Sequence, residues 1–277
     1  MNQSNFTTAV TLQDGSTLSV EVYGDGPTLL LPVNPRPIEG PQAEQLLQYG
    51  MDPALGQNLI SGLKDIVRVA AFDYEGHLWK HPRPDTLTPD HVVSDLLAIA
   101  DAVQADQFAY YGYSVFAMIG LQLALRTNRL TGLVMGGWPP IDGPYAEMLK
   151  VTTAGWEMAE GTPNPDDEWS TAGLSKAQTR QYVTLYESLQ GFDDRAVQSQ
   201  ITCPGLCFVG STDEIMYEKP WGDVLVSLAG PLLREQAQLE ALGWDVRVLD
   251  GLDHMQAMQA AHVIPVLRPW LAGVFSL

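Results

Sequence analysis

Six short apolar runs constrain the fold of this sequence more than any other feature. They are "TLLLP" (28–32), "IVRVAAFD" (66–73), "FAYYG" (108–112), "LTGLVMGGW" (130–138), "GLCFVG" (205–210) and "DVRVLDG" (245–251). A run with no polar face is typical of a strand covered on both sides, as in a parallel sheet flanked by helices. Amphipathic stretches separate several of the runs. This alternation predicts an α/β fold with a mostly parallel sheet and helices on both faces.

The clearest predicted helix lies in "TPDHVVSDLLAIADAVQ" (88–104). Thr88 can cap its N-terminus, and Pro89 suits the first helical position, where no backbone N–H is needed. The apolar residues recur at helical spacing and form one stripe: Val92, Val93, Leu96, Ile99, Ala100 and Val103. The shorter stretch "LGQNLISGLK" (55–64) is also amphipathic. Both are therefore predicted to pack on the sheet.

Two segments depart from the regular alternation. "TTAVTLQDGSTLSVEVYGDG" (7–26) alternates apolar and polar residues around a turn at Asp14, which predicts an antiparallel hairpin at a sheet edge. Residues 142–200 contain helical pieces but no strand-like run. We expect residues 1–141 and 201–277 to form one core domain and residues 142–200 to form a helical cap inserted over one end of the sheet.

Charge and composition exclude some partners. The net charge is −18 with only 15 basic residues, which argues against a nucleic-acid partner because phosphate binding needs clustered Lys and Arg. The N-terminus does not resemble a signal peptide, and no stretch has the apolar length of a membrane span, so no membrane association and a cytoplasmic location are expected. Cys203 and Cys207 are expected to be free thiols. A homo-oligomer stays possible.

The stretch "YYGYSVFAMIG" (110–120) places Ser114 between an apolar strand and an amphipathic segment. A sharp turn at this junction lifts a serine hydroxyl out of the sheet, beside the free N–H groups at the start of the helix. A serine hydroxyl is a weak nucleophile until an adjacent base, oriented by a third group, activates it. Ser114 is therefore a candidate nucleophile, and partners should follow later strands.

Two later segments supply such partners. "LCFVGSTDEI" places Asp213 just past one predicted strand, and "VRVLDGLDHMQAM" places His254 past the next. The carboxyl ends of parallel strands meet at one edge of a sheet, where α/β proteins gather their chemistry. We expect Ser114 to attack a carbonyl, His254 to take and return its proton, and Asp213 to orient the imidazole. Asp142, which follows the preceding strand, is the second choice for the acid.

The order of these elements resembles that of the α/β-hydrolase superfamily over essentially the whole chain. The hairpin, the strand ending in "FDYEGH", the serine turn, the insertion, and the acid and histidine turns follow one another as they do in that family. The resemblance implies an oxyanion hole made by the backbone N–H groups of Asn34 and Val115. His77, in "FDYEGH", is expected to be structural, with a place in the pocket as the alternative.

The chain departs from the family pattern at two positions. Phe116 stands where many relatives have the last glycine of G-x-S-x-G. Pro32 and Val33 stand where relatives commonly have His-Gly in the oxyanion turn. A malformed hole would leave a protein that binds ligands without hydrolysing them, so this alternative is kept.

The substrate site is expected to be apolar and aromatic. Tyr113, Phe116 and Trp138 are the predicted substrate-binding residues, and residues 39–55 are expected to form a loop that helps to wall the pocket. The predicted insertion adds further candidates: Tyr145, Met148, Trp156, Met158, Trp169, Tyr182 and Tyr186. Such a lining favours a hydrophobic ligand of small to medium size.

These features predict a serine hydrolase acting on an ester-like, small-molecule acyl substrate. Carbon–carbon bond hydrolysis, lactone hydrolysis and cofactor-free peroxidase activity are alternatives that use the same three residues. Ser114 disfavours epoxide opening and dehalogenation, because relatives that perform them use a carboxylate nucleophile. No histidine pair has the spacing of a zinc helix, so no metal and no cofactor are expected.

Overall fold

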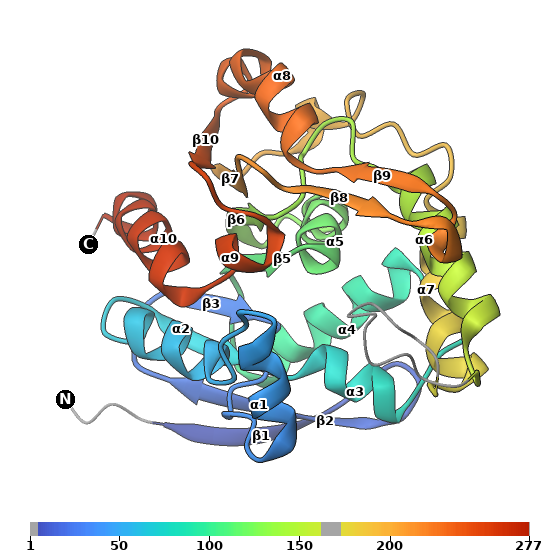
Figure 1. The fold of residues 1–277 in the computed structure, drawn as a ribbon. Coiled ribbons are helices and arrows are strands. Elements are labelled where there is room, and N and C mark those ends of the chain that lie inside the picture. The colour runs from blue at the N-terminus through green and yellow to red at the C-terminus, as the bar shows by residue number, and fades with distance from the viewer. Residues whose placement is uncertain (1–4, 162–172, 277) are drawn as a thin grey trace.

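The structure, a computed structural model, describes residues 5–161 and 173–276. Its centre is an eight-stranded sheet with the order β1-β2-β4-β3-β5-β6-β7-β10 (Figure 1). The strands are β1 (Phe6–Thr11), β2 (Thr17–Tyr23), β3 (Thr28–Leu31), β4 (Arg68–Ala71), β5 (Phe108–Tyr113), β6 (Leu130–Gly136), β7 (Gly205–Gly210) and β10 (Trp244–Leu249). All six apolar runs contribute strands, which confirms the predicted α/β fold.

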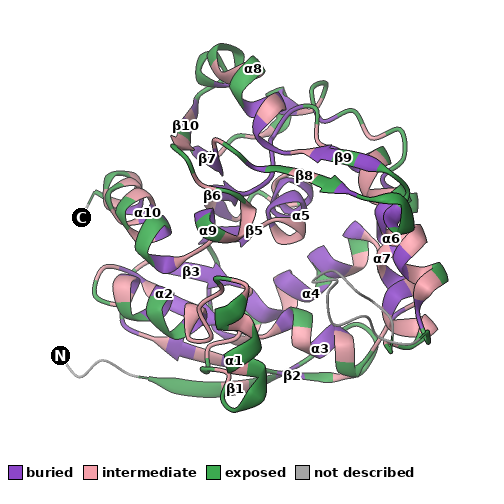
Figure 2. Ribbon diagram, in the orientation of Figure 1, coloured by how far each residue is buried: buried purple, intermediate pink, exposed green. Residues whose placement is uncertain are grey.

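The sheet is parallel from β4 to β10, and only the first two strands run against their neighbours. β1 pairs with β2 in an antiparallel hairpin at the sheet edge, with Thr8 opposite Val20. The predicted hairpin is therefore confirmed, and its alternation is visible in burial, since Val20 and Val22 are buried while Ser19 is exposed. Figure 2 shows β1 as an exposed edge beside buried central strands.

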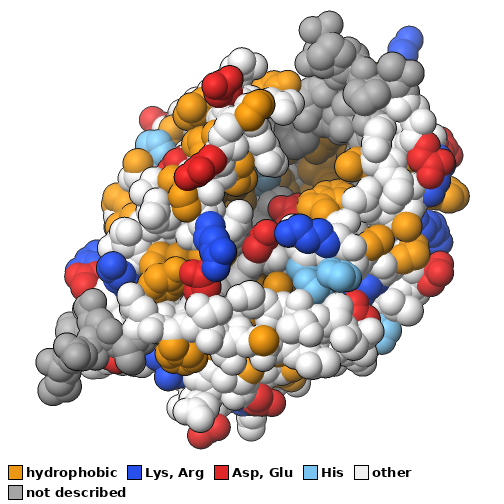
Figure 3. Space-filling model, turned by 90° about the horizontal axis from the view of Figure 1, so that it is seen from below, with side chains coloured by type: hydrophobic (Ala, Val, Ile, Leu, Met, Phe, Trp, Pro, Cys, Tyr) orange, Lys and Arg blue, Asp and Glu red, His pale blue; other side chains and the backbone are white. Residues whose placement is uncertain are grey.

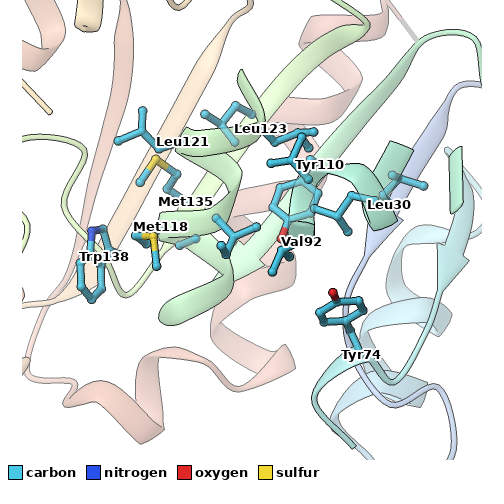
Figure 4. Packing of buried hydrophobic residues seen from close by; sticks show 14 of the residues in the cluster. Leu30, Tyr74, Val92, Tyr110, Met118, Leu121, Leu123, Met135 and Trp138 are labelled. Carbon is cyan, nitrogen blue, oxygen red and sulfur yellow. The ribbon is translucent and has the colours of Figure 1, made fainter. Parts of the chain in front are cut away.

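Two helical layers cover the sheet. On one face lie α2 (Leu55–Leu63) and α10 (Ala260–Phe275), and on the other lie α4 (Pro89–Ala102), α5 (Val115–Ala124) and α8 (Ala229–Ala241). Successive residues of a strand point to opposite faces, so Leu29 and Leu30 join different apolar clusters. The double burial explains the continuous apolar runs. Figure 4 shows the cluster around α5, with Tyr74 and Trp138 at its two ends.

Local sequence sets the ends of these helices. The Thr88 side chain accepts a hydrogen bond from the backbone N–H of His91, and Pro89 occupies the first turn of α4, as predicted. The prediction of a loop over residues 39–55 is wrong in part, because Pro41–Gln48 form helix α1. None of its residues is buried, so the helix lies on the surface and does not pack into the core.

The segment between β6 and β7 contains α6 (Tyr145–Met158), α7 (Lys176–Ser188) and the short 3-10 helix η1 (Gln198–Gln200). The two longer helices pack against each other to one side of the sheet (Figure 1). Most of the predicted "EGTPNPDDE" loop lies outside the described residues. The helical content agrees with the prediction for residues 142–200, whereas the role of a cap stays a prediction.

Smaller elements were not anticipated. A two-stranded sheet, β8 (Glu214–Tyr217) with β9 (Val224–Ser227), follows β7 and contacts α6. Between its strands lies the 3-10 helix η2 (Lys219–Trp221), and α3 (Tyr74–Lys80) and α9 (His254–Ala257) follow β4 and β10. Within the described ranges, no helix has both the length and the apolar character needed to cross a bilayer.

Candidate active site

Ser114 occupies a strained turn between β5 and α5. Its backbone has φ 56° and ψ −123°, and its N–H donates a hydrogen bond of 2.8 Å to the carbonyl of Gly136. A positive φ is unfavourable for a residue with a Cβ and is found where surrounding structure enforces it. Gly112 permits the tightness, since a Cβ there would lie 2.2 Å from the Phe116 carbonyl oxygen. The backbone of α5 thus passes directly over β5 and projects Ser114 from the sheet.

The structure brings Ser114, His254 and Asp213 together. His254 Nε2 lies 3.2 Å from Ser114 Oγ, while His254 Nδ1 lies 2.9 Å and 3.1 Å from the two carboxylate oxygens of Asp213. The Asp213 side chain is fully buried. This arrangement fixes which imidazole nitrogen faces the serine, and it can support proton transfer to and from the hydroxyl.

Backbone contacts hold the acid in place. The Asp213 carbonyl accepts hydrogen bonds from the N–H groups of Leu228 (3.1 Å) and Ala229 (3.0 Å), where β9 leads into α8. The β8–β9 hairpin therefore begins and ends at Asp213. The second-choice acid, Asp142, instead makes ion pairs with Arg195 (3.0 Å) and Arg234 (2.6 Å).

Tyr113 supports the histidine. Its hydroxyl donates a 2.7 Å hydrogen bond to the His254 carbonyl, and the two rings lie 5.1 Å apart between centroids. Burial, followed by the Asp213 charge, raises the pKa of Tyr113 well above its ordinary value, so the hydroxyl stays protonated and available as a donor. Gly137, with φ 62°, makes room for this ring, because a Cβ there would lie 2.6 Å from it.

The two expected oxyanion donors have free N–H groups. No described residue accepts a hydrogen bond from the N–H of Asn34 or of Val115. Val115 is the first residue of α5 and lines the cavity next to Ser114. The Val33 N–H is occupied by the Leu31 carbonyl at 2.9 Å, and the Asn34 side chain accepts from the Arg36 N–H at 3.0 Å. The Pro-rich turn thus leaves the predicted donors available.

A cavity of about 260 Å³ opens at Ser114 and His254. Its other lining residues are Glu75, Trp79, Val115, Trp138, Met148, Thr152, Tyr182, Tyr186, Ile215, Tyr217, Val226 and Leu228. They come from α3, α6, α7 and the β8–β9 hairpin as well as from the sheet edge. Figure 3 shows one face of the molecule, hollowed and with hydrophobic side chains gathered around the hollow.

The structure places one of the three predicted substrate-binding residues at this cavity. Trp138 lines the cavity, but Tyr113 and Phe116 do not. Tyr113 lies behind His254, and the Phe116 ring packs edge-on against Tyr74, with centroids 6.1 Å apart, because the Phe116 backbone sits over Gly112. The departure from G-x-S-x-G therefore turns a ring toward the core rather than into the cavity.

The insertion contributes fewer aromatic residues than expected. Met148, Tyr182 and Tyr186 line the cavity, whereas Tyr145, Trp156 and Met158 do not. Trp169 lies outside the described residues. The helices α6 and α7 thus each present one side to the cavity.

Sequence reasoning missed Glu75 and Trp79. They lie four residues apart on α3 and both face the cavity, a spacing that would have marked them as one helical face. Enclosure by protein, aided by the charge of Asp73, raises the pKa of Glu75 although its side chain is exposed to the cavity. His77 is buried instead, with Nε2 2.8 Å from Ser16 Oγ, which agrees with its expected structural role.

The remaining candidates for special chemistry lie apart. His81 and His262 are exposed, and His91 is half-buried. Cys203 and Cys207 are free thiols, as expected. Across the described residues, no three His, Cys, Asp or Glu side chains gather into a group able to hold a metal ion.

Comparison by sequence and by structure gives different results. No protein-family model and no curated protein matches the chain. Among solved structures, a thermophilic esterase from Thermogutta terrifontis is 16% identical, with a TM-score of 0.62 over 98% of this chain and 99% of its own. A carboxylesterase from Nitrososphaera gargenis is 17% identical, with a TM-score of 0.61 over 97% and 99%.

An epoxide hydrolase from Vigna radiata is 14% identical, with a TM-score of 0.57 over 97% of this chain and 98% of its own. These similarities span nearly the whole of both chains, although few residues are shared. The protein therefore has the α/β-hydrolase fold.

Proposed function

We propose that this protein is a serine hydrolase that cleaves an ester-like bond in a small, largely hydrophobic acyl substrate. The observation that carries the proposal is the continuous hydrogen-bonded series from Ser114 through His254 to the buried Asp213, opening on a cavity. Esterases and carboxylesterases among the similar structures agree with this chemistry.

The proposed reaction has two steps. Ser114 Oγ attacks the substrate carbonyl while His254 Nε2 takes its proton, and the proton then passes to the departing alcohol. Water next attacks the carbonyl carbon of the acyl-serine and gives a proton to His254, which passes it to Ser114 Oγ as the C–O bond breaks and the carboxylic acid leaves. Asp213 holds the imidazole in the required tautomer and stabilises its charged form.

Val115 and Asn34 are the proposed oxyanion donors. Both N–H groups lack an acceptor among the described residues, and Val115 belongs to the strained turn that presents Ser114. In enzymes of this kind, removing one such donor costs about 3 to 4 kcal/mol of transition-state stabilisation. The free donors argue against the alternative of a binding protein with a malformed hole.

A serine nucleophile distinguishes the proposed ester hydrolysis from epoxide opening. One of the proteins with a similar structure is an epoxide hydrolase. Serine attack on an epoxide carbon would leave an ether, which water does not readily cleave. Serine attack on a carbonyl leaves an ester, which His254 and water can resolve. Lactones and carbon–carbon bonds beside a carbonyl satisfy the same requirement and belong in the same substrate panel.

Labelling with a fluorophosphonate probe, followed by mass spectrometry of the modified peptide, tests the nucleophile. We expect modification at Ser114 and its loss in Ser114→Ala and His254→Ala. Ser94→Ala is the matched control, because Ser94 is exposed on α4, where its hydroxyl donates a hydrogen bond to the Asp90 carbonyl. Hydrolysis of short p-nitrophenyl esters should fall at least a thousandfold in the first two variants. Folded wild-type protein that is neither labelled nor active would contradict the proposal.

A further inference from the structure

Glu75 is an acidic side chain in a cavity wall made mostly of aromatic and aliphatic residues. It lies in the first turn of α3, which the Asp73 side chain caps through the N–H of Gly76 at 2.9 Å. Tyr74 and Leu78, on an adjacent side of this helix, are buried in the core. Packing of that side directs Glu75 toward the cavity.

The carboxylate has no partner within the described part of the chain. No hydrogen bond or ion pair involves it there, although it faces protein on several sides. The hydroxyl of Tyr182 is also buried without a hydrogen-bond partner. Both residues line the cavity, and the Glu75 charge adds to burial in raising the pKa of Tyr182. The Tyr182 hydroxyl is enclosed by protein, so the exposed Glu75 carboxylate is the group of this pair that a ligand in the cavity can reach.

Trp79 completes this corner of the cavity. Its ring lies 5.3 Å from that of Tyr182 between centroids. Hydrogen bonds fasten α7 to α3 beside it, from Gln178 Nε2 to the Trp79 carbonyl (2.8 Å) and from Gln181 Nε2 to the Leu78 carbonyl (3.3 Å). We call Glu75, Trp79 and Tyr182 the Glu75 subsite. Its members come from two segments that the protein holds together.

The chemistry of the subsite selects a cation. A carboxylate that faces a cavity lined mostly by apolar side chains favours a ligand that compensates its charge. An ammonium group supplies that compensation through a charge-assisted hydrogen bond. It is also attracted to the faces of Trp and Tyr rings. The net charge of −18 favours the approach of cations over anions.

We propose that the Glu75 subsite binds a protonated amine of the substrate, so that the enzyme prefers acyl substrates carrying an ammonium group away from the scissile carbonyl. This inference rests on the proposed hydrolase function and names its substrate class. Glu75 would pair with the ammonium group, and the rings of Trp79 and Tyr182, which line the same cavity, would attract it as well. Ser114 and His254 would act on the carbonyl at the other side of the cavity.

Matched ester pairs test the preference. Each pair consists of a p-nitrophenyl ω-aminoalkanoate and the alkanoate in which a methyl group replaces the amine, over a series of chain lengths. At one length at least, wild type should show a tenfold or greater ratio of kcat/KM in favour of the amine. Glu75→Gln should lower this ratio at least tenfold, whereas Tyr182→Phe, which keeps the ring at the cavity wall, should leave it near the wild-type value. No preference at any length, or an unchanged ratio in Glu75→Gln, would overturn the proposal.

Glu44→Gln is the matched control. Glu44 is exposed on α1, so this variant removes the same charge from the protein without touching the cavity. Its ratio should equal that of wild type. An equal loss of preference in both variants would assign the effect to net charge and would overturn the subsite.

A binding measurement separates the subsite from the hydrolase proposal. Alkylammonium ions and alcohols of equal length are titrated into Ser114→Ala, with and without Glu75→Gln. Ammonium binding that Glu75→Gln weakens at least tenfold supports the subsite even when no ester is cleaved. Ester hydrolysis without ammonium preference or binding supports the hydrolase alone and overturns the subsite.

Discussion

The hydroxyl of Tyr113, the residue before the candidate nucleophile, donates a 2.7 Å hydrogen bond to the backbone carbonyl of His254, the candidate base. One strand end thus carries Ser114 and also holds the loop of its partner. In Tyr113→Phe this carbonyl loses its donor while the ring stays in place. A neutral hydrogen bond of this kind contributes about 1 kcal/mol. Ester hydrolysis should therefore show kcat reduced about five- to tenfold, with KM nearly unchanged. Tyr49→Phe, at the end of α1, is the control, and a Tyr113→Phe variant that changes only KM would contradict a positioning role.

The backbone conformation at Ser114 predicts which of two substitutions at this position, glycine or alanine, gives the more stable protein. Its φ of 56° is costly for any residue with a Cβ and not for glycine. Ser114→Gly should therefore be about 1 kcal/mol more stable to urea unfolding than Ser114→Ala, the reverse of the usual order for these two residues. Equal stabilities would show that the turn carries no strain.

A side chain at position 112 would clash with α5, the helix that follows the turn. A Cβ on this residue would lie 2.2 Å from the Phe116 carbonyl oxygen and 2.4 Å from its carbon. Because these are backbone atoms, Gly112→Ala must shift α5, and the unfolding free energy should fall by about 2 kcal/mol or more. Gly273→Ala is the matched control, since it has open space in α10 and should raise stability slightly. Similar effects of both changes on urea unfolding would contradict the tight elbow.

Replacement of the buried Asp95 should strongly lower the stability of the protein. Its buried carboxylate accepts hydrogen bonds from Arg83 Nη1 and the Tyr74 hydroxyl, both at 2.6 Å. Asp95→Ala leaves the Arg83 guanidinium buried without this partner, which should cost about 3 to 5 kcal/mol in unfolding free energy. Asp90→Ala, which breaks an exposed pair with Arg126, should cost less than about 1 kcal/mol. Thermal unfolding of the two variants provides the comparison.

The raised pKa of Glu75 predicts that the stability of the folded protein depends on pH. Enclosure by protein and the Asp73 charge raise its pKa in the folded state above the ordinary 4.5, so the folded protein binds this proton more tightly than the unfolded chain does. Its contribution is therefore most favourable below pH 4.5 and declines as the pH rises through the raised value. The Tm of Glu75→Gln should therefore rise relative to the Tm of wild type as the pH increases over this window. A Tm difference that stays constant from acid to neutral pH would contradict this assignment.

The sheet was predictable because each central strand is apolar on both faces. Leu29 and Leu30 show the reason, since adjacent residues enter the two different clusters and neither position tolerates a polar side chain. The β8–β9 hairpin gave no comparable signal. Its strands are four residues long, and Met216 and Leu225 are exposed while Tyr217 and Val226 are buried. Such short, half-exposed strands acquire their structure from contacts with α6.

The three triad candidates were accessible from sequence because each follows a strand of a parallel sheet, whose carboxyl ends share one edge. The cavity wall was harder to predict. Phe116 was expected in it, but the direction of its ring depends on how closely α5 approaches Gly112. Glu75 was overlooked because its surroundings include Tyr182, a residue far away in the chain. Local patterns locate strand ends, and only tertiary packing decides which side chains meet above them.

The β8–β9 hairpin has a consequence for how this pocket can change over evolutionary time. It leaves and rejoins the core at Asp213, whose carbonyl receives the N–H groups of Leu228 and Ala229. The same hairpin supplies Ile215 and Val226 to the wall. Mutations in the hairpin that reshape this wall can therefore also displace Asp213, so they put both substrate fit and catalysis at risk. α6 presents Met148 and Thr152 without such a tie, and new ligand preferences are more readily acquired from that side.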